Sequence, residues 1–264
     1  MPAADPITLR AAVDRLKIEV HPSRAAAGTN AGKAAAAHLR ALLAGQRQVR
    51  MIFACAPSQN EFLATLTAEA GIDWGRVTAF HMDEYLGLPA NHPACFRAYL
   101  REHVTSLVPL GKTNEIAGDA ADPEGECRRY ASLLGEGPID AVCLGIGENG
   151  HLAFNDPPVA SFRDPVRVKL VDLDEACRRQ QVNDGCFPSL GDVPRRAVTL
   201  TIPALLSGAR LFCIVPGPRK AQAVERALRG PVAPGCPASI LRTHLDATLY
   251  LDSESAARWR GEPA

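Results

Sequence analysis

Short, mostly apolar runs alternate with amphipathic stretches along most of the chain. Such runs are typical of strands that are buried on both faces, as in a parallel sheet between helix layers. The runs are residues 49–54, 76–82, 139–145, 167–171, 197–202, 210–215 and 247–252. They predict the strands of a mainly parallel sheet.

Helical spacing of apolar residues predicts the segments before and between these strands. Apolar residues at positions 9, 12, 13 and 16 predict a first helix, and the alanine-rich residues 25–43, which end at Gly45, predict a second. Further helices are predicted at residues 60–71, 94–107, 126–134, 174–182 and 218–230. The alternation indicates an α/β fold: one domain over residues 1–264, with a mainly parallel, Rossmann-like sheet and helices on both faces.

Composition and charge narrow the range of partners. The 264 residues include 29 basic and 29 acidic side chains, and this zero net charge gives no general attraction to nucleic acid or to anionic membranes. The eight cysteines form no CxxC pair and several lie in apolar runs, which indicates reduced thiols and a cytoplasmic protein. Residues 1–10 show no export signal, and no apolar run approaches the roughly 20 residues that span a bilayer.

Four segments directly follow predicted strands, where ligands of parallel α/β sheets bind. These candidates for function are residues 56–60, 83–87, 147–151 and 216–220. The second begins with two adjacent carboxylates, Asp83 and Glu84, which have two interpretations. They are turn or cap residues, or Asp83 is a partly desolvated base that removes a proton from carbon.

The third segment lies within LGIGENGHLAFNDPP, residues 144–158. A tight connection needs only one or two glycines, so the surplus indicates backbone that passes close to a ligand. His151 is a candidate acid or base, which Asn149 and Asp156 are placed to orient, and the alternative is a histidine hydrogen-bonded to its own loop. No second histidine or cysteine lies at a ligand spacing from His151, so we expect no metal.

Basic residues supply a candidate anion site. Lys220 lies at a predicted strand-to-helix turn, and Arg178 or Arg179 lies in the middle of a helical segment. Together with a helix N-terminus they are suited to a phosphate. The alternative is a set of solvated basic side chains.

Two long segments resemble a known family. Residues 80–100 (FHMDEYLGLPANHPACFRAYL) and residues 144–158 resemble the two most diagnostic segments of glucosamine-6-phosphate deaminases, which share their fold with 6-phosphogluconolactonases. MDEY followed by GLP, together with GHLAFN, is far more specific than a lone glycine pattern. Residues 193–206 and 215–228 are further landmarks, so the resemblance covers most of the chain.

The resemblance implies an enzyme that needs no cofactor. The family converts glucosamine 6-phosphate to fructose 6-phosphate and ammonia, so the implied partner is a small amino-sugar phosphate, and a homo-oligomer is possible. It implies that Asp83 is the general base, through an enolamine-type intermediate, and that His151 assists opening of the sugar ring. Phosphate binding is implied for Lys220 and Arg179. The substrate-binding candidates are Ser58, Gln59, Asn60, Glu84, Gly147, Gly150, Arg178, Arg179 and Lys220.

The chain departs from the family pattern next to the histidine. Asn149 stands where the deaminases carry an aspartate before GH, and Asp156 stands where they carry a glutamate after AFN. An asparagine cannot stabilise an imidazolium by charge, and an aspartate reaches less far by one methylene.

A third departure concerns phosphate binding. The family's glycine- and threonine-rich loop after the first sheet strand is here ACAPSQNEF, residues 54–62. Pro57 lacks an amide donor, while Ser58, Gln59 and Asn60 offer side-chain donors. A phosphate at the following helix N-terminus, a different amino sugar and an unphosphorylated substrate all stay open.

The leading hypothesis is therefore an amino-sugar-phosphate deaminase/isomerase. One alternative is a sugar lactone hydrolase like 6-phosphogluconolactonase, which shares the fold and the histidine and needs only water activation. The other is a non-catalytic sugar-phosphate-binding regulator that kept the pocket and lost the charge at Asn149.

Overall fold

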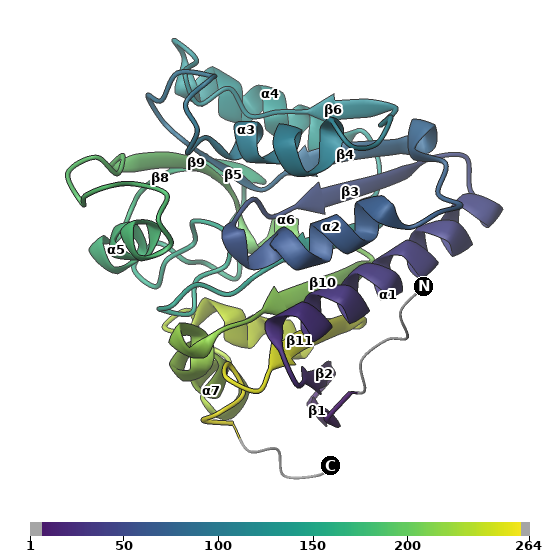
Figure 1. Ribbon diagram of the computed structural model, residues 1–264. Coiled ribbons are helices and arrows are strands. Elements are labelled where there is room, and N and C mark those ends of the chain that lie inside the picture. Colours follow the sequence, from purple (N-terminus) through teal and green to yellow (C-terminus); the bar gives the residue numbers. More distant parts are fainter. Residues whose placement is uncertain (1–6, 260–264) are drawn as a thin grey trace.

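The computed structural model of the chain describes residues 7–259 and centres on an eight-stranded sheet (Figure 1). The strand order is β1-β2-β11-β10-β7-β3-β4-β6, and every neighbouring pair from β2 onward is parallel, which confirms the predicted sheet type. The strands are β1 Leu9–Val13, β2 Leu16–His21, β3 Val49–Phe53, β4 Val77–His81, β6 Lys112–Asn114, β7 Ala141–Leu144, β10 Arg210–Val215 and β11 Ala247–Asp252.

The predicted helix near residue 9 is wrong. This segment is the antiparallel hairpin of β1 and β2, with Asp14 at a positive φ of 51° in its turn. In β2 the apolar Leu16, Ile18 and Val20 are buried and alternate with polar residues, which is the period of a strand. The helical spacing at positions 9, 12, 13 and 16 was therefore a coincidence of a short sequence.

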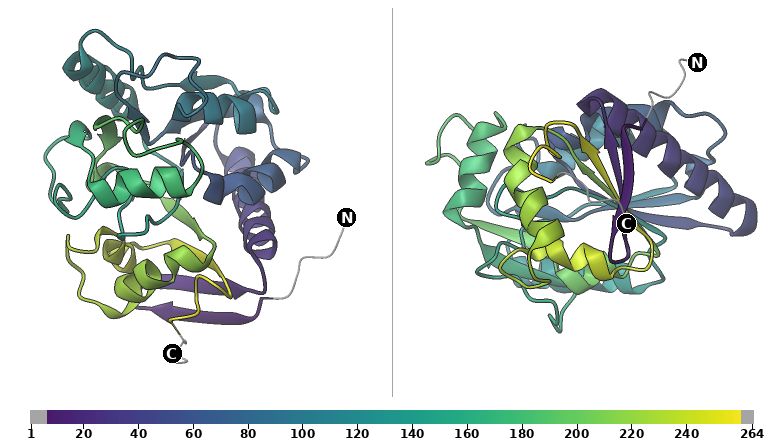
Figure 2. Two further views of the ribbon diagram at one scale, coloured as in Figure 1. Left: turned by 60° about the vertical axis from the view of Figure 1, so that its left-hand side comes forward. Right: turned by 90° about the horizontal axis from the view of Figure 1, so that it is seen from below.

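Helices cover both faces of the sheet, as predicted. Successive residues of β3 point to opposite sides: Met51 joins one core cluster with α1 and α2, and Ile52 joins the other with α4 and α7. The right-hand view in Figure 2 shows α1 and α7 on opposite sides of the strands. The helices are α1 Arg24–Gly45, α2 Asn60–Ala68, α3 Phe96–Leu100, α4 Pro123–Gly135, α5 Glu175–Asn183, α6 Ile202–Leu206 and α7 Ala221–Arg229.

The long helix α1 contains two glycines that its contact with α2 requires. A Cβ at Gly28 would lie 2.5 Å from the Cβ of Glu61, and one at Gly32 would lie 2.7 Å from the Cβ of Thr65. Real Cβ atoms do not approach that closely, so the two helices can pack at this distance only with glycine here. This packing holds the N-terminal end of α2 beside the end of β3.

A second, antiparallel sheet has the strand order β5-β9-β8, with β5 Asp83–Tyr85, β9 Arg196–Leu200 and β8 Val168–Asp172. The prediction that residues 167–171 and 197–202 belong to the parallel sheet is therefore wrong. β9 pairs with β5, which follows β4 directly, and β8 pairs with the other edge of β9. The small sheet lies beside the carboxyl ends of the main strands (Figure 1). Asp83 is the first residue of β5 and pairs with Thr199, so this small sheet fixes the backbone of Asp83.

Between residues 7 and 259 no helix is both long enough and apolar enough to cross a membrane. The single-domain organisation stays a prediction.

Candidate active site

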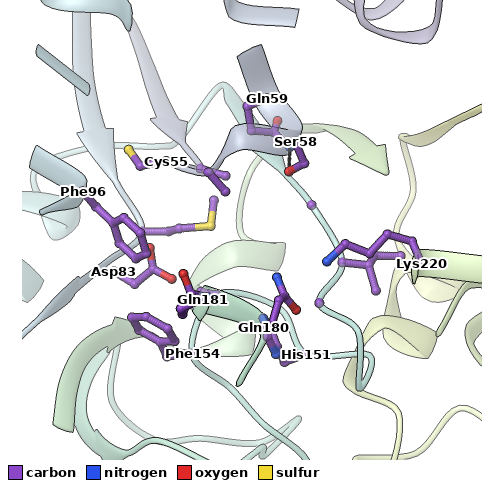
Figure 3. Close-up of a pocket in the computed structure, with 17 residues that line it drawn as sticks. Cys55, Ser58, Gln59, Asp83, Phe96, His151, Phe154, Gln180, Gln181 and Lys220 are labelled. Carbon is purple, nitrogen blue, oxygen red and sulfur yellow. Dashed lines mark hydrogen bonds between the residues drawn. The ribbon is translucent and has the colours of Figure 1, made fainter. Parts of the chain in front are cut away.

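A cleft lies at the carboxyl ends of β3, β4, β7 and β10 (Figure 3). It encloses about 530 Å³ of empty space, part of which is open to solvent. The polar side chains that line it come from all four predicted strand-end segments and from α5: they are Ser58, Gln59, Asp83, His151, Gln180, Gln181 and Lys220. The strand-end rule therefore located the cleft but missed the contribution of α5.

Asp83 lies at the inner end of this cleft and is 6% exposed. Burial raises the pKa of its carboxyl well above the usual range, and the negative charge of Glu84 raises it further. Phe96 and Phe154 line the cleft near the carboxylate (Figure 3). A carboxyl group in this setting holds a proton more strongly than a solvated one and is correspondingly a stronger base once ionised.

Glu84 points away from the cleft, which it does not line, and is fully buried. Its carboxylate accepts hydrogen bonds from the backbone amides of Tyr85 at 2.9 Å, Phe96 at 3.0 Å and Arg97 at 2.9 Å. Burial raises the pKa of Glu84 to about 7, although these amides act in the opposite direction. The structure therefore gives Glu84 the cap role that the sequence left open, and not a place in the cleft.

We expect Glu84→Ala to lower the free energy of unfolding by about 1–3 kcal/mol, because it leaves buried amide donors without an acceptor. Urea unfolding followed by circular dichroism measures the change. Glu102→Ala, which removes an exposed carboxylate, is the control and should have little effect. Equal stability of the Glu84→Ala and wild-type proteins would contradict the cap role.

A buried histidine supports the backbone of Asp83. His81 is fully buried, and its Nε2 accepts a hydrogen bond of 2.8 Å from the amide of Ile116. Nδ1 therefore carries the proton and donates to the carbonyl oxygen of Asp83 at 2.9 Å. Burial lowers the pKa of His81 to about 3, so the ring stays neutral. This role of His81 was not predicted, because a contact with a residue as distant in sequence as Ile116 leaves no local sequence pattern.

His151 faces the cleft with a carboxylate behind it. Its Nδ1 lies 2.9 Å from Oδ1 of Asp156, which is 1% exposed. Burial opposes ionisation of Asp156, but the charge and hydrogen bond of His151 and a hydrogen bond from Asn149 outweigh it and lower the pKa of Asp156. The shorter aspartate thus does reach the ring.

Asn149 holds this pair without touching the imidazole. Its Nδ2 donates to Oδ1 of Asp156 at 2.8 Å and lies 3.4 Å from Oδ2 of Asp174, while its Oδ1 accepts from the amide of His151 at 3.0 Å. The contacts are compatible with the expectation that Asn149 helps to orient His151, through Asp156 and through the backbone of His151. Asn149 orients Asp156, and Asp156 orients His151.

The glycines of the loop mostly meet protein atoms. A Cβ at Gly147 would lie 2.2 Å from Cε1 and from Nε2 of His151, so the ring lies flat against this glycine. Gly150 has a positive φ of 92°, and a Cβ there would lie 2.8 Å from Sγ of Cys236. Gly147 lines the cleft and Gly150 does not. The surplus of glycines thus serves the placement of the histidine as well as any approach to a ligand.

We expect Gly147→Ala to slow turnover about 100-fold, because a misplacement of roughly 1 Å at a catalytic group costs on that order. The new methyl group must push the His151 ring out of position. Steady-state kinetics and a thermal melt separate lost activity from lost folding. Gly135→Ala, where a Cβ meets nothing within 4 Å, is the control and should keep wild-type turnover; equal turnover of the two variants would contradict the prediction.

Lys220 closes the outer side of the cleft. It ends the short helix Pro218–Lys220 after β10, is 8% exposed, and points into the cavity (Figure 3). Burial lowers the pKa of its ammonium, while Asp184 and Glu148 act to raise it. Among residues 7–259 no hydrogen bond or ion pair of the Lys220 Nζ is found, so its donors are available to a ligand.

The two candidate arginines and Asn60 do not line the cleft, which corrects their predicted place. Arg178 donates to the carbonyl oxygens of Leu190 and Val193, and Arg179 pairs with Glu175 on the exposed side of α5. The side chain of Asn60 accepts a hydrogen bond from Tyr99, and its donors are not directed at the cleft. The face of α5 that does reach the cleft carries Gln180 and Gln181.

Three possible metal ligands lie close to one another behind the ring. One atom each of His151, Asp156 and Cys177 fall within 4.8 Å of one another. The search for ligand spacings near His151 overlooked Cys177 because it lies on a different element. Burial and then the charge of Asp156 raise the pKa of this thiol. Asp156 lies against the ring of His151, so we assign Asp156 to its orientation. The expectation that the site holds no metal stays a prediction.

Comparison with known proteins establishes the family. A family model described as "Glucosamine-6-phosphate isomerases/6-phosphogluconolactonase" matches residues 22–250. A glucosamine-6-phosphate deaminase of Listeria monocytogenes is 36% identical over 200 residues, which cover 76% of this chain and 83% of that protein. The deaminase of Exiguobacterium sibiricum is 34% identical over 186 residues, which cover 70% of this chain and 72% of that protein.

Solved structures agree. A monomeric glucosamine-6-phosphate deaminase has a TM-score of 0.83 and 28% identity over 91% of this chain and 99% of that chain. The 6-phosphogluconolactonase of Thermotoga maritima, at 18% identity, has the same fold with a TM-score of 0.73 over 90% of this chain and 99% of that chain. The chain belongs to the glucosamine-6-phosphate isomerase/6-phosphogluconolactonase family. It is an enzyme of the deaminase-like kind within that family.

Proposed function

We propose that the chain deaminates and isomerises a 2-amino sugar: glucosamine 6-phosphate to fructose 6-phosphate and ammonia, or the same reaction on a close analogue. One observation carries the proposal. The buried carboxylate of Asp83 and the ring of His151, which Asp156 backs at 2.9 Å, face the same cleft (Figure 3). The similarity to deaminases supports the reaction class.

The two groups divide the reaction between them. His151 moves a proton between the C1 hydroxyl and the ring oxygen as the sugar ring opens, with Asp156 stabilising the imidazolium. Asp83 removes the proton from C2, beside the C1 aldehyde, to form an enolamine, and returns it to C1. Water adds to the resulting iminium carbon C2 and ammonia leaves. One water is consumed and one ammonia is released for each 2-ketose.

The surroundings of Asp83 suit this role. Its proton acceptor must be strong, because a proton on carbon is weakly acidic even next to an aldehyde, and the raised pKa of Asp83 supplies a stronger base than a solvated carboxylate. The carbonyl of Asp83 is held by His81, so the carboxylate has a fixed origin. A rigid base keeps the reacting atoms aligned.

Ammonia release from a panel of 2-amino sugars, free and 6-phosphorylated, tests the proposal. We expect one member to give ammonia and the matching 2-ketose in equal amounts. Hydrolysis of 6-phosphogluconolactone without ammonia release from any amino sugar would instead support a lactonase. Sugar binding with neither reaction would support the non-catalytic regulator.

A further inference from the structure

We propose that the site takes a free 2-amino-2-deoxyhexose, with a hydroxyl group and not a phosphate at its distal carbon. This inference rests on the reaction proposed above and names its substrate class. It follows from the side chains at the outer side of the cleft, opposite Asp83, where a sugar held by Asp83 and His151 would place its distal carbon (Figure 3).

The cleft has few cations for a phosphate. Lys220 is the one basic side chain, histidine apart, among the described residues that line it. Arg178 and Arg179 bond elsewhere, as described above. Phosphate sites in proteins usually combine bidentate arginine contacts or several free amides at a helix N-terminus. At the start of the helical turn after β3, Pro57 provides no amide hydrogen.

The charges around the outer side are already balanced. Arg24 and Arg219 border a neighbouring hollow that shares Lys220 with the cleft. Arg24 pairs with Glu61 at 2.6 Å, and Arg219 pairs with Glu148 at 3.4 Å and Asp184 at 3.1 Å.

The hollow is lined by Arg24, Arg219 and Lys220 and by one carboxylate, Asp184. Glu61 and Glu148 pair with the two arginines without lining the hollow, and counting them gives three cations and three carboxylates. A phosphate dianion would bring two further negative charges next to Glu148 and Asp184. A hydroxyl group brings none, and a single lysine is enough to donate a hydrogen bond to it.

The neutral side chains of the cleft match hydroxyl groups better than an anion. Gln59 uses its amide group as a donor to Oγ of Ser58 at 3.0 Å and to the carbonyl oxygen of Ile214 at 3.2 Å. Its Oε1 is buried and has no donor among the described residues. An amide that presents only an acceptor disfavours a nearby phosphate, which also only accepts.

Gln181 is a further polar side chain of the cleft whose hydrogen-bond donors and acceptor are unused in the described part of the chain. It is 7% exposed, lies beside Asp83 in the cleft, and its side chain has no hydrogen-bond partner within residues 7–259 (Figure 3). An amide both donates and accepts, as each sugar hydroxyl does, so Gln181 can satisfy a hydroxyl in both directions. The amide atoms of Gln181 are not among the fully buried ones without a partner, so they keep contact with solvent, which a polyhydroxylated ligand would replace.

Steady-state ammonia release tests the proposal with free glucosamine, galactosamine and mannosamine and with their 6-phosphates. We expect kcat/KM for the best free sugar to exceed that for its 6-phosphate by roughly tenfold or more. A higher kcat/KM for a 6-phosphate would overturn this inference and leave the deaminase proposal supported. Ammonia from none of them would contradict the deaminase proposal, and binding then decides the inference.

Calorimetric titration of the Asp83→Asn protein measures binding of the same sugars without turnover. We expect the free amino sugar to bind roughly tenfold more tightly than its 6-phosphate. Tighter binding of the 6-phosphate, or binding of neither form, would overturn the inference.

A charge variant tests the argument from balance. Asp184→Asn removes one carboxylate beside Arg219 and should tighten binding of the 6-phosphate by about two- to fivefold, the range for an exposed charge pair. Glu175→Gln is the matched control, because it frees Arg179 outside the cleft and should leave both affinities unchanged. Unchanged binding of the 6-phosphate by Asp184→Asn would contradict the balance of charge.

Discussion

Asp83→Asn should fold normally and release ammonia about 100- to 10,000-fold more slowly than the wild-type protein, which is the usual contribution of a general base. Asparagine keeps the size and shape of the side chain but cannot accept a proton from carbon. The change is measured as kcat with the best amino sugar, and as exchange of the C2 proton with deuterated water.

Asp172→Asn provides the control for this prediction. Asp172 lies on β8, and its side chain is 89% exposed and far less constrained than that of Asp83. It should keep wild-type kcat. A folded Asp83→Asn protein that exchanged the C2 proton at the wild-type rate would end the assignment of Asp83 as base.

The Asp83→Asn variant also tests how the free energy of unfolding depends on pH. The pKa of Asp83 is raised in the folded protein, so between the ordinary aspartate pKa and this raised value the folded state holds a proton that the unfolded state has lost. The free energy of unfolding therefore falls as pH rises through that window. The melting temperature of the wild-type protein should drop more between pH 4 and pH 8 than that of Asp83→Asn. A parallel drop in both proteins would show that Asp83 titrates normally.

Strands buried on both faces were predictable, because a short run of apolar residues is typical of such strands and of few other structures. The hairpin at residues 9–21 was not predicted. Each of its strands pairs over only five residues of mixed polarity, and so short a segment fits a helical and a strand period almost equally. The small antiparallel sheet was hidden for a different reason. Residues 168–172 and 196–200 look like the other strands locally, and only the pairing of Asp83 with Thr199 shows that they leave the main sheet.

The candidate site was also predictable only in part. Strand ends converge in any parallel sheet, so Asp83, His151 and Lys220 could be placed near one another from the sequence. The orientation of α5 could not, because it has few apolar residues to mark its buried face. Its buried residues are Cys177, Gln180 and Gln181, two of them amides, and the adjacent Arg178 and Arg179 are the more obvious ligands for a phosphate.

The departure at Asn149 takes a different meaning from its contacts. It bridges two carboxylates, those of Asp156 and Asp174. An aspartate at this position would crowd three carboxylates together, and like charges at such distances raise a pKa and oppose ionisation. Asparagine is thus the suitable partner for an aspartate at 156, and the two departures form one unit.

Asp156→Asn should lower kcat for a cyclic amino sugar by on the order of 10²- to 10⁴-fold, as loss of the carboxylate partner does to other catalytic histidines. The amide cannot stabilise an imidazolium, and its NH₂ group, if turned to Nδ1, selects the wrong tautomer of His151. The matched control is Asp174→Asn, which removes the other carboxylate near Asn149 without touching the ring and should stay close to wild type. A loss that came only from misfolding would appear in the thermal melt, and a loss in KM alone would point to sugar binding. Because only ring opening needs His151, the Asp156→Asn protein should still exchange the C2 proton of sugar that has opened in solution, and loss of that exchange to the level of Asp83→Asn would refute the division of labour between the two groups.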